Sequence, residues 1–431
     1  MQSVRVEGRP DETAPARRPP DELYLLDPEL LADPAGGYGR VREQGPVVRA
    51  WLTDEQPVWL VTRYDDVRDG LRDPRFVNSP AAIPGFTGPD PRRPLVDMLN
   101  LPAEVLDYFM ISALDIDPPD HTRMRGAVAR SFTGRRMQAL RPRIEQVVEE
   151  LLAALPAHAE NGAADLVERF AYPLATTVVC ELVGIPEAVR PLFRQWGDDI
   201  VTMDPDRLGT SSPALIEAVH DLLRQRRERP ADDMLTALAE ATGSGRYPIS
   251  EKEAVTMTLN VVMAGYENAA QLIINAVAAL VTHPEQLELL RTDRALLPGA
   301  VEEFIRWCGP DIMVRMRIAA EDTELHGTPI RQGDAVQFIL VSANHDPRRY
   351  PDAHRLDLTR RQADQSEGHL GFGGGIHYCL GASISRLECE TALRGLLDRY
   401  PGLAMAVAPE DLPRIAIPGA APRYTGLPLL V

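Results

Sequence analysis

The sequence predicts a mainly α-helical fold with a few small β-sheets. Its apolar residues recur at spacings of three and four over long stretches, which is typical of helices with one buried face. These stretches cover residues 121–131, 136–155, 165–183 and 213–229. Segments with the character of strands are short and few, and they lie at residues 46–64, 314–318 and 335–341. A composition of 44% hydrophobic and 25% charged residues is ordinary for a folded protein, so a globally disordered chain is excluded.

The N-terminal part of the chain begins with a polar segment. Residues 1–20 lack the apolar core of a signal peptide, and we expect a disordered leader followed by one domain over residues 21–431. Residues 46–64 predict two strands joined by a turn at residues 53–56. Residues 77–108 are rich in proline and glycine, and a connection of this length predicts a lid or a binding loop. Ser212 and Pro213 predict the start of a helix.

The longest helix is expected over residues 249–281. Ser250 and Glu253 have the spacing of a capping box at its start. The segment is apolar on most of its surface, which indicates a helix through the centre of the molecule. A short polar segment, Gly265-Tyr266-Glu267-Asn268, interrupts this apolar pattern. Two further helices are expected over residues 297–308 and 380–399.

Charge, apolar patterning and cysteine content exclude several classes of protein. The chain carries 46 basic and 63 acidic side chains, and the resulting net charge of −17 argues against nucleic acid as a partner. No apolar stretch is long and unbroken enough to predict a transmembrane helix. The four cysteines, at positions 180, 308, 379 and 389, are too few and too scattered for a disulfide framework. Together with the polar N-terminus, this predicts a cytoplasmic protein.

The sharpest local signal is the glycine-rich run from Gly371 to Ala382, which contains Cys379 just before the last helix. Glycines allow a close approach of the backbone to a ligand, and the positive end of a helix dipole stabilises a thiolate. A shielded thiolate in such a loop is a candidate axial ligand for iron. Two other interpretations stay open here: Cys379 as a small buried hydrophobic residue, and His377 with Cys379 as two zinc ligands.

The motif Phe372-x-x-Gly375-x-x-x-Cys379-x-Gly381 resembles the haem-thiolate signature of the cytochrome P450 family. Three other segments resemble that family in the same order. Glu303-Phe304-Ile305-Arg306 resembles the Glu-x-x-Arg of its K helix, and Ala264-Gly265-Tyr266-Glu267 resembles the oxygen-binding kink of its long I helix. Residues 117–125 resemble its bacterial C-helix segment. The resemblance covers roughly residues 115–390 and implies the cytochrome P450 fold, with haem between the I helix and the C-terminal helix.

The resemblance also implies roles for individual residues. Cys379 would bind the iron of haem b, and a thiolate ligand favours cleavage of the O–O bond. The positions that would contact the haem are His121, Arg125, Ala264, Arg317, Phe372, Gly373, Gly375, His377, Cys379 and Gly381. Cationic and hydrogen-bonding groups among them would hold the two buried propionates. Glu303, Arg306 and Arg355 would form a buried network with a folding role.

The I-helix segment departs from the family pattern at one position. The family usually has an acid followed by threonine, whereas here Glu267 is followed by Asn268. A carboxylic acid can deliver protons through water, but an amide is a poor proton carrier. Gly265, Glu267 and Asn268 are the candidate catalytic residues, and water or a substrate group would have to complete the proton relay. The alternatives are a salt-bridged Glu267 and an Asn268 that bonds a helix carbonyl.

The resemblance implies a monomeric oxidoreductase that uses dioxygen and electrons from NAD(P)H, delivered by a ferredoxin or a flavodoxin. The expected reaction is hydroxylation or a related oxidation of a small natural product, either free or attached to a carrier protein. Val261, Val262, Met313 and Val314 are the candidate substrate contacts, since small-molecule sites are mainly apolar. Two alternatives stay open: oxidative C–C or C–N coupling of aromatic rings without oxygen insertion, suggested by Asn268, and a haem-binding protein without turnover.

Overall fold

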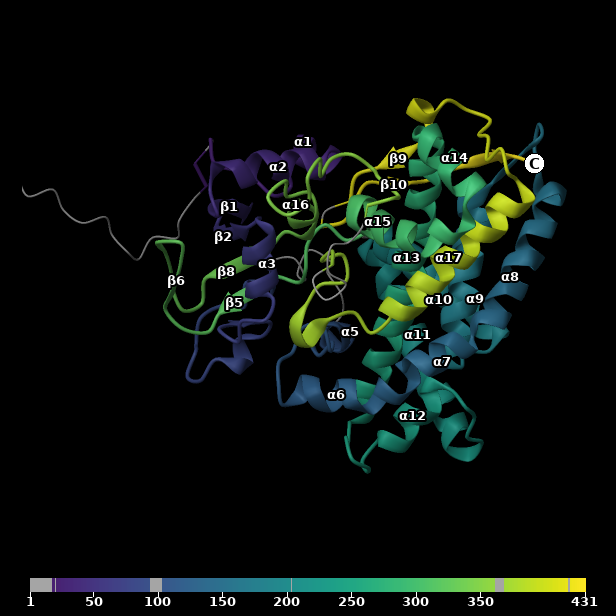
Figure 1. Cartoon of the computed structure of the whole chain (residues 1–431). Coiled ribbons are helices and arrows are strands. Elements are labelled where there is room, and N and C mark those ends of the chain that lie inside the picture. The colour runs from purple at the N-terminus through teal and green to yellow at the C-terminus, as the bar shows by residue number, and fades with distance from the viewer. Residues whose placement is uncertain (1–17, 20, 94–102, 203, 361–367, 418) are drawn as a thin grey trace, which may run out of the picture.

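The fold has a sheet region formed mainly by N-terminal residues and a larger helical region, side by side in Figure 1. The computed structural model describes residues 18–19, 21–93, 103–202, 204–360, 368–417 and 419–431. The leader predicted for residues 1–20 lies outside the described residues, apart from Arg18 and Pro19. Arg18 is fixed by Asp54, with a backbone hydrogen bond of 2.8 Å and an ion pair of 3.0 Å.

The main sheet has five strands in the order β1-β2-β8-β5-β3. Their bounds are Val47–Thr53, Gln56–Val61, Ala335–Phe338, Arg317–Ala319 and Phe76–Val77, in that order. Strands β1 and β2 pair antiparallel through a short turn, which confirms the turn predicted at residues 53–56. Strand β8 then pairs parallel to β2, with Trp59 opposite Val336. The sheet therefore brings residues 317–338 next to the N-terminal hairpin.

Three two-stranded sheets complete the β-structure of the described residues. They pair β9 (Arg414–Ile415) with β10 (Arg423–Tyr424), β4 (Ala163–Asp165) with β11 (Pro428–Leu430), and β6 (Thr323–Leu325) with β7 (Thr328–Ile330). Short helices flank the main sheet: α1 (Pro28–Ala32), α2 (Pro34–Gln44), α3 (Tyr64–Gly70) and α16 (Leu340–Asn344). The expected mainly helical fold with small sheets is thus confirmed.

Helix α13 (Glu251–Thr282) runs through the centre of the helical region (Figure 1). The predicted capping box is present, because Ser250 accepts from the Glu253 backbone N–H and the Glu253 side chain accepts from the Ser250 N–H. Most of α13 is buried, as its apolar surface predicts. Around it pack α8 (Arg141–Ala154), α9 (Tyr172–Val183), α15 (Leu297–Cys308) and α17 (Ala382–Arg399), which share one hydrophobic core with its C-terminal half.

A second hydrophobic cluster surrounds the N-terminal half of α13. It is formed mainly by α6 (Asp120–Val128), α10 (Arg190–Thr202), α11 (Pro205–Glu228) and α12 (Met234–Ala241). Helix α11 begins at Pro205 with Asp204 as its N-cap, so the helix start predicted at Ser212 and Pro213 was wrong. Packing of Leu208 and Leu215 into the cluster carries the helix through Pro213 despite the hydrogen bond lost there.

The remaining elements are short. They are α5 (Ala103–Met110), which lies within the predicted loop 77–108, α7 (Gly134–Ala139), α14 (Pro284–Thr292) and a π-helical turn, η4 (Val167–Ala171). The 3-10 turns are η1 (Pro80–Ala82), η2 (Ala129–Phe132), η3 (Leu155–His158), η5 (Glu187–Val189), η6 (Arg294–Leu296), η8 (Gly375–His377) and η9 (Pro409–Asp411). Within the described residues, every helix is too short or too polar to span a bilayer.

Candidate functional site

One stripe of α13 is left uncovered by its neighbours. Ala264 is exposed although the residues around it in the helix are mostly buried, and Val261, Gly265 and Asn268 beside it are partly exposed. These positions are spaced by one, three and four residues, so they lie on one face of the helix. A Cβ on Gly265 would lie 2.5 Å from a methyl group of Val179, so glycine there allows α9 to pack closely. This uncovered stripe forms the α13 side of the candidate site.

The loop that carries Cys379 depends on two glycines with positive φ. Gly373 has φ +67° and Gly375 has φ +64°, a region that side chains disfavour. A Cβ on Gly375 would also lie 2.3 Å from the carbonyl oxygen of Leu71. The Cys379 N–H donates to the Phe372 carbonyl at 3.1 Å, which closes the loop. This motif therefore fixes the position of the sulfur through backbone geometry.

Burial raises the pKa of the Cys379 thiol. The Gly381 N–H and the charges of Arg125 and Arg386 act in the opposite direction but do not outweigh burial. The Gly381 N–H at the start of α17 therefore acts in the predicted direction, favouring a thiolate, but burial outweighs it. A bound metal ion deprotonates a thiol outright. Among the described residues no three His, Cys, Asp or Glu groups could together hold a metal ion.

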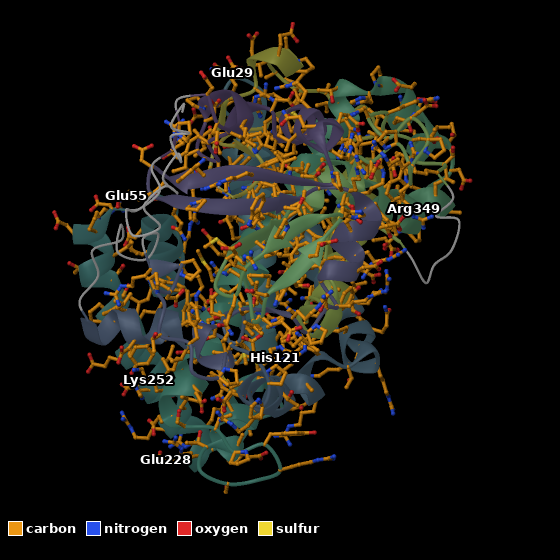
Figure 2. All side chains as sticks on the ribbon, turned by 90° about the vertical axis from the view of Figure 1, so that its left-hand side faces the viewer. Glu29, Glu55, His121, Glu228, Lys252 and Arg349 are labelled. Carbon is orange, nitrogen blue, oxygen red and sulfur yellow. The ribbon has the colours of Figure 1, made fainter. Side chains whose placement is uncertain are left out.

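Four basic side chains meet beside this loop, and we call them the basic cluster: His121 and Arg125 from α6, Arg317 from β5 and His377 from η8. The rings of His121, labelled in Figure 2, and His377 lie 4.3 Å apart between centroids. His121 is 4% exposed and Arg317 5%. The helix, strand and loop that carry these residues come from distant parts of the sequence, as the resemblance implied.

Negative charge near the basic cluster does not balance it: Asp117 acts on His121 and Arg317, and Asp115 acts on Arg317, but burial outweighs both. Burial and the neighbouring cations lower the pKa of His377 to about 2, and burial lowers the pKa of Arg317 to about 10. The pKa values of His121 and Arg125 are lowered mainly by burial as well. The Arg317 Nε has no hydrogen-bond partner among the described residues. Buried cations with an orphaned donor fit a ligand that brings carboxylates to them, and the two propionates of haem are such carboxylates.

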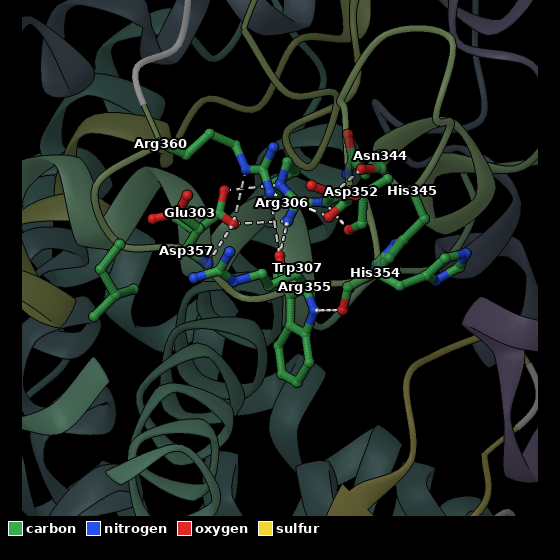
Figure 3. A network of polar contacts seen from close by, with 12 residues as sticks. Glu303, Arg306, Trp307, Asn344, His345, Asp352, His354, Arg355, Asp357 and Arg360 are labelled. Carbon is green, nitrogen blue, oxygen red and sulfur yellow. Dashed lines mark hydrogen bonds and ion pairs between the residues drawn. The ribbon is translucent and has the colours of Figure 1, made fainter. Parts of the chain in front are cut away.

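A second charged group, the Glu303 network, is fully paired. Glu303 and Arg306 are each 1% exposed, and their side chains form two hydrogen bonds of 2.7 and 2.8 Å (Figure 3). Arg306 also donates to the carbonyls of Asn344 and Ala353, both at 2.8 Å. This geometry supports the folding role that the resemblance implied for the pair.

Arg355 was predicted as the third side chain of the Glu303 network, and this prediction was wrong. Arg360, not Arg355, donates from its side chain to Glu303, at 3.1 Å (Figure 3). Arg355 is exposed and contributes only its carbonyl oxygen, which accepts from Arg306 and Arg360. The chain turns at residues 352–355, so the Arg355 side chain faces outward while Arg360 reaches back to Glu303.

Glu267 is held in an ion pair instead of standing free on the uncovered stripe. It is 4% exposed, its Oε1 lies 3.0 Å from the Arg423 Nη1, and it accepts from the Tyr172 hydroxyl at 3.0 Å. The salt-bridged alternative therefore describes its geometry. Asn268 donates to the Asp311 carboxylate at 3.2 Å, so the alternative in which it bonds a helix carbonyl is wrong.

The candidate substrate contacts divide into two groups. Val261, Met313 and Val314 are partly exposed; Val261 lies on the uncovered stripe, and a methyl group of Val314 lies beside Gly373 of the Cys379 loop. Val262 is 2% exposed and packs in the second hydrophobic cluster, so its assignment as a substrate contact was wrong. One residue separates a lining position from a core position on a helix, because successive side chains point about 100° apart.

Four residues of the site were not predicted from the sequence: Arg360, Asp311, Arg423 and Asn78. Each acts through a contact with a residue far away in the chain, and none stands in a local motif. For Asp311 the only local signal was an acid directly after Gly309-Pro310, at the end of a helix. The amide of Asn78 bonds the His377 ring.

Comparison with known proteins gives concordant matches. The family model for cytochrome P450 matches residues 210–413. Cytochrome P450 monooxygenase PikC of Streptomyces venezuelae is 39% identical over 94% of this chain and 92% of its own length. Mycinamicin IV hydroxylase/epoxidase of Micromonospora griseorubida is 36% identical over 88% of this chain and 91% of its own. The solved structure of the cytochrome P450 PksS of Bacillus subtilis 168, from the bacillaene polyketide synthase, matches with a TM-score of 0.81 and 32% identity, covering 93% of this chain and 97% of that one.

Proposed function

This chain belongs to the cytochrome P450 family and is an oxidoreductase of the monooxygenase type, and we propose that it hydroxylates a small natural product of secondary metabolism. The observation that supports haem-dependent chemistry most strongly is the meeting of Cys379 with the basic cluster, in which all four pKa values are lowered and the Arg317 Nε has no hydrogen-bond partner among the described residues. The relatives named as a monooxygenase and a hydroxylase support oxygen insertion over ring coupling or binding without turnover.

The residues proposed to hold haem divide by chemistry. Cys379 would bind the iron, and the basic cluster would bind the two propionates. Phe372, Gly373, Gly375 and Gly381 shape the loop around the sulfur. On α13, Ala264 presents only a methyl group, and Gly265 lets α9 pack closely behind it. Haem, when bound, supplies the iron at which dioxygen is reduced and activated.

The chain's own groups would control protons and water on the α13 side. Asn268 holds its amide N–H toward Asp311, so it orients a donor at the uncovered stripe without carrying a proton itself. Glu267 is held at Oε1 by Arg423 at 3.0 Å, which keeps its carboxylate in one place on the α13 side. Tyr172 donates to the same oxygen and fixes its direction. The catalytic assignment of Gly265, Glu267 and Asn268 is part of this proposal.

Electrons would come from NAD(P)H through a ferredoxin or a flavodoxin. Docking of an acidic reductant needs positive charge near the Cys379 loop. Arg130 and Arg136 pair with Glu240 and Asp232, so they contribute little net positive charge. Arg386 lies closer to Cys379, but it is paired with Glu302 at 2.6 Å, so its positive charge is partly balanced as well. A cytoplasmic location, a monomeric state and a substrate that is free or carried by a protein belong to the same proposal.

The decisive experiment combines the haem-loaded chain with a ferredoxin, its reductase, NADPH and ¹⁸O-labelled dioxygen, and offers a panel of polyketides. Products that gain one labelled oxygen would support hydroxylation. A product that has lost two hydrogens without gaining oxygen would assign ring coupling instead. The third outcome is a spin-state change on substrate binding without any product, although the reductant reduces the haem. This outcome would indicate a haem-binding protein without turnover.

A further inference from the structure

Asp311 is an acidic residue on the α13 side of the site that the proposed reaction does not use. It follows Pro310 in the segment between α15 and β5, and its carboxylate accepts from the Asn268 amide at 3.2 Å. Its neighbour Ile312 is 1% exposed, whereas Asp311 itself is partly exposed. Its charge also raises the pKa of Cys379. Asp311 therefore faces the region between the α13 stripe and the Cys379 loop.

No cation of the described residues forms an ion pair with Asp311. Arg423 lies 3.0 Å from Glu267, and Arg315 lies 3.8 Å from Asp115. Burial raises the pKa of Asp311 to about 6, with Glu267 acting in the same direction and Arg315 and Arg423 against it. The carboxylate is thus ionised near neutral pH and has only a neutral amide as its hydrogen-bond partner.

The surroundings of Asp311 combine polar and apolar groups. Asn268 bonds its carboxylate, the charges of Arg315 and Arg423 act on it from a distance, and Met313 and Val314 on its own segment are partly exposed apolar residues. A desolvated carboxylate without an ion pair is costly, and it interacts strongly with a cation that reaches it because little water screens the pair. Ligand sites commonly combine apolar walls with one such charged group that sets orientation.

We propose that Asp311 is a specificity-determining residue that binds a positively charged nitrogen of the substrate, such as a protonated amine. The substrate class would then be an apolar molecule that carries one cationic group next to Asn268. This inference rests on the proposed function, because it places the substrate between the α13 stripe and the haem.

The test uses the haem-loaded chain and three probes of equal chain length: octyltrimethylammonium, octan-1-ol and octanoate. A quaternary ammonium cannot bind iron, so the spectral shift of the haem reports occupancy of the site alone. We expect the cation to bind more tightly than the alcohol, and the anion to bind most weakly. The Asp311→Asn variant should lose at least about tenfold in affinity for the cation, equivalent to about 1.4 kcal/mol, and keep its affinity for the alcohol.

The Asp322→Asn variant is the matched control, because it removes the same charge from an exposed residue that contacts Arg331. It should leave all three affinities unchanged. In the wild type the cation preference should also disappear as pH falls through about 6, where Asp311 becomes protonated while Arg315 and Arg423 stay charged. The pH titration of the wild type needs no variant, so it still tests the proposal if Asp311→Asn fails to fold. Repeating the titration in Glu267→Gln shows whether protonation of Glu267 causes the pH effect. An unchanged haem spectrum across the same pH range excludes a change at Cys379.

Equal affinity of the wild type for the cation and the alcohol would overturn the proposal. An Asp311→Asn variant that binds the cation as the wild type does would also overturn it, and would leave a proton-carrying role for Asp311. Loss of haem binding by the wild-type chain would contradict the proposed function instead, so the two failures are distinguishable.

Discussion

Two buried charged groups of this molecule differ in how they are balanced. In the Glu303 network, a carboxylate and two arginines satisfy each other and nearby carbonyls. In the basic cluster, four basic groups meet, the Arg317 Nε is left without a partner among the described residues, and every pKa is lowered. Buried charge is stabilising only when it is paired. The Glu303 network is therefore balanced within the protein, whereas the basic cluster is the group that we propose binds the haem propionates.

The largest expected effect is the loss of stability from breaking the Glu303 network. Glu303→Gln would leave the buried Arg306 without its carboxylate, and such losses cost about 3–5 kcal/mol. Urea unfolding of the haem-loaded and haem-free chains should show the same loss in both forms. A variant as stable as the wild type would remove the distinction between the two groups.

The next effect concerns the basic cluster, where one substitution should stabilise the haem-free chain but weaken its binding of haem. Arg317→Leu should stabilise the haem-free chain, because it removes a desolvated cation, and weaken haem binding by about 2–5 kcal/mol, mostly as faster release. Transfer of haem to an excess of apomyoglobin measures the release rate. An unchanged release rate would show that Arg317 does not contact the ligand.

A smaller effect distinguishes the two arginines near Glu303. Arg360→Ala should lower the free energy of unfolding by roughly 1–3 kcal/mol, because its partner is a buried carboxylate. Arg355→Ala keeps the carbonyl that accepts from Arg306, and its stability should stay close to that of the wild type. Thermal unfolding of the two variants side by side is the measurement. The reverse order would restore the original prediction for Arg355.

The last effect, which is the smallest per pH unit at no more than about 1.4 kcal/mol, is a pH dependence that should be steeper in the haem-free chain. His377 has its pKa lowered to about 2 in the folded chain, so between pH 2 and about 6.5 the unfolded chain binds more protons. Stability of the haem-free chain should fall as pH drops through that window. Bound propionates would raise the pKa of His377, so the haem-loaded chain should lose less. Equal pH slopes in the two forms would contradict the assignment of the basic cluster.

Local patterns in the sequence predicted the parts of this molecule that local geometry determines. The glycine-rich loop, the capping box at Ser250 and the Glu303–Arg306 pair are contacts within a few residues, and each was found where it was expected. The contacts of Arg360 with Glu303 and of Glu267 with Arg423 could not be predicted from the sequence. Each joins chain segments whose approach depends on the whole fold. The helix start predicted at Pro213 was wrong for a related reason, because tertiary packing outweighs a local helix-start signal.

The ligand of the iron is the central claim, and the carbon monoxide spectrum of the reduced, haem-loaded chain tests it most directly. The wild type and a Cys180→Ala control, which changes another buried thiol, should both give the spectrum typical of thiolate ligation. Cys379→Ala should lose that spectrum while the chain stays folded by circular dichroism. A Cys379→Ala variant with the wild-type spectrum would show that another side chain binds the iron and would contradict the account.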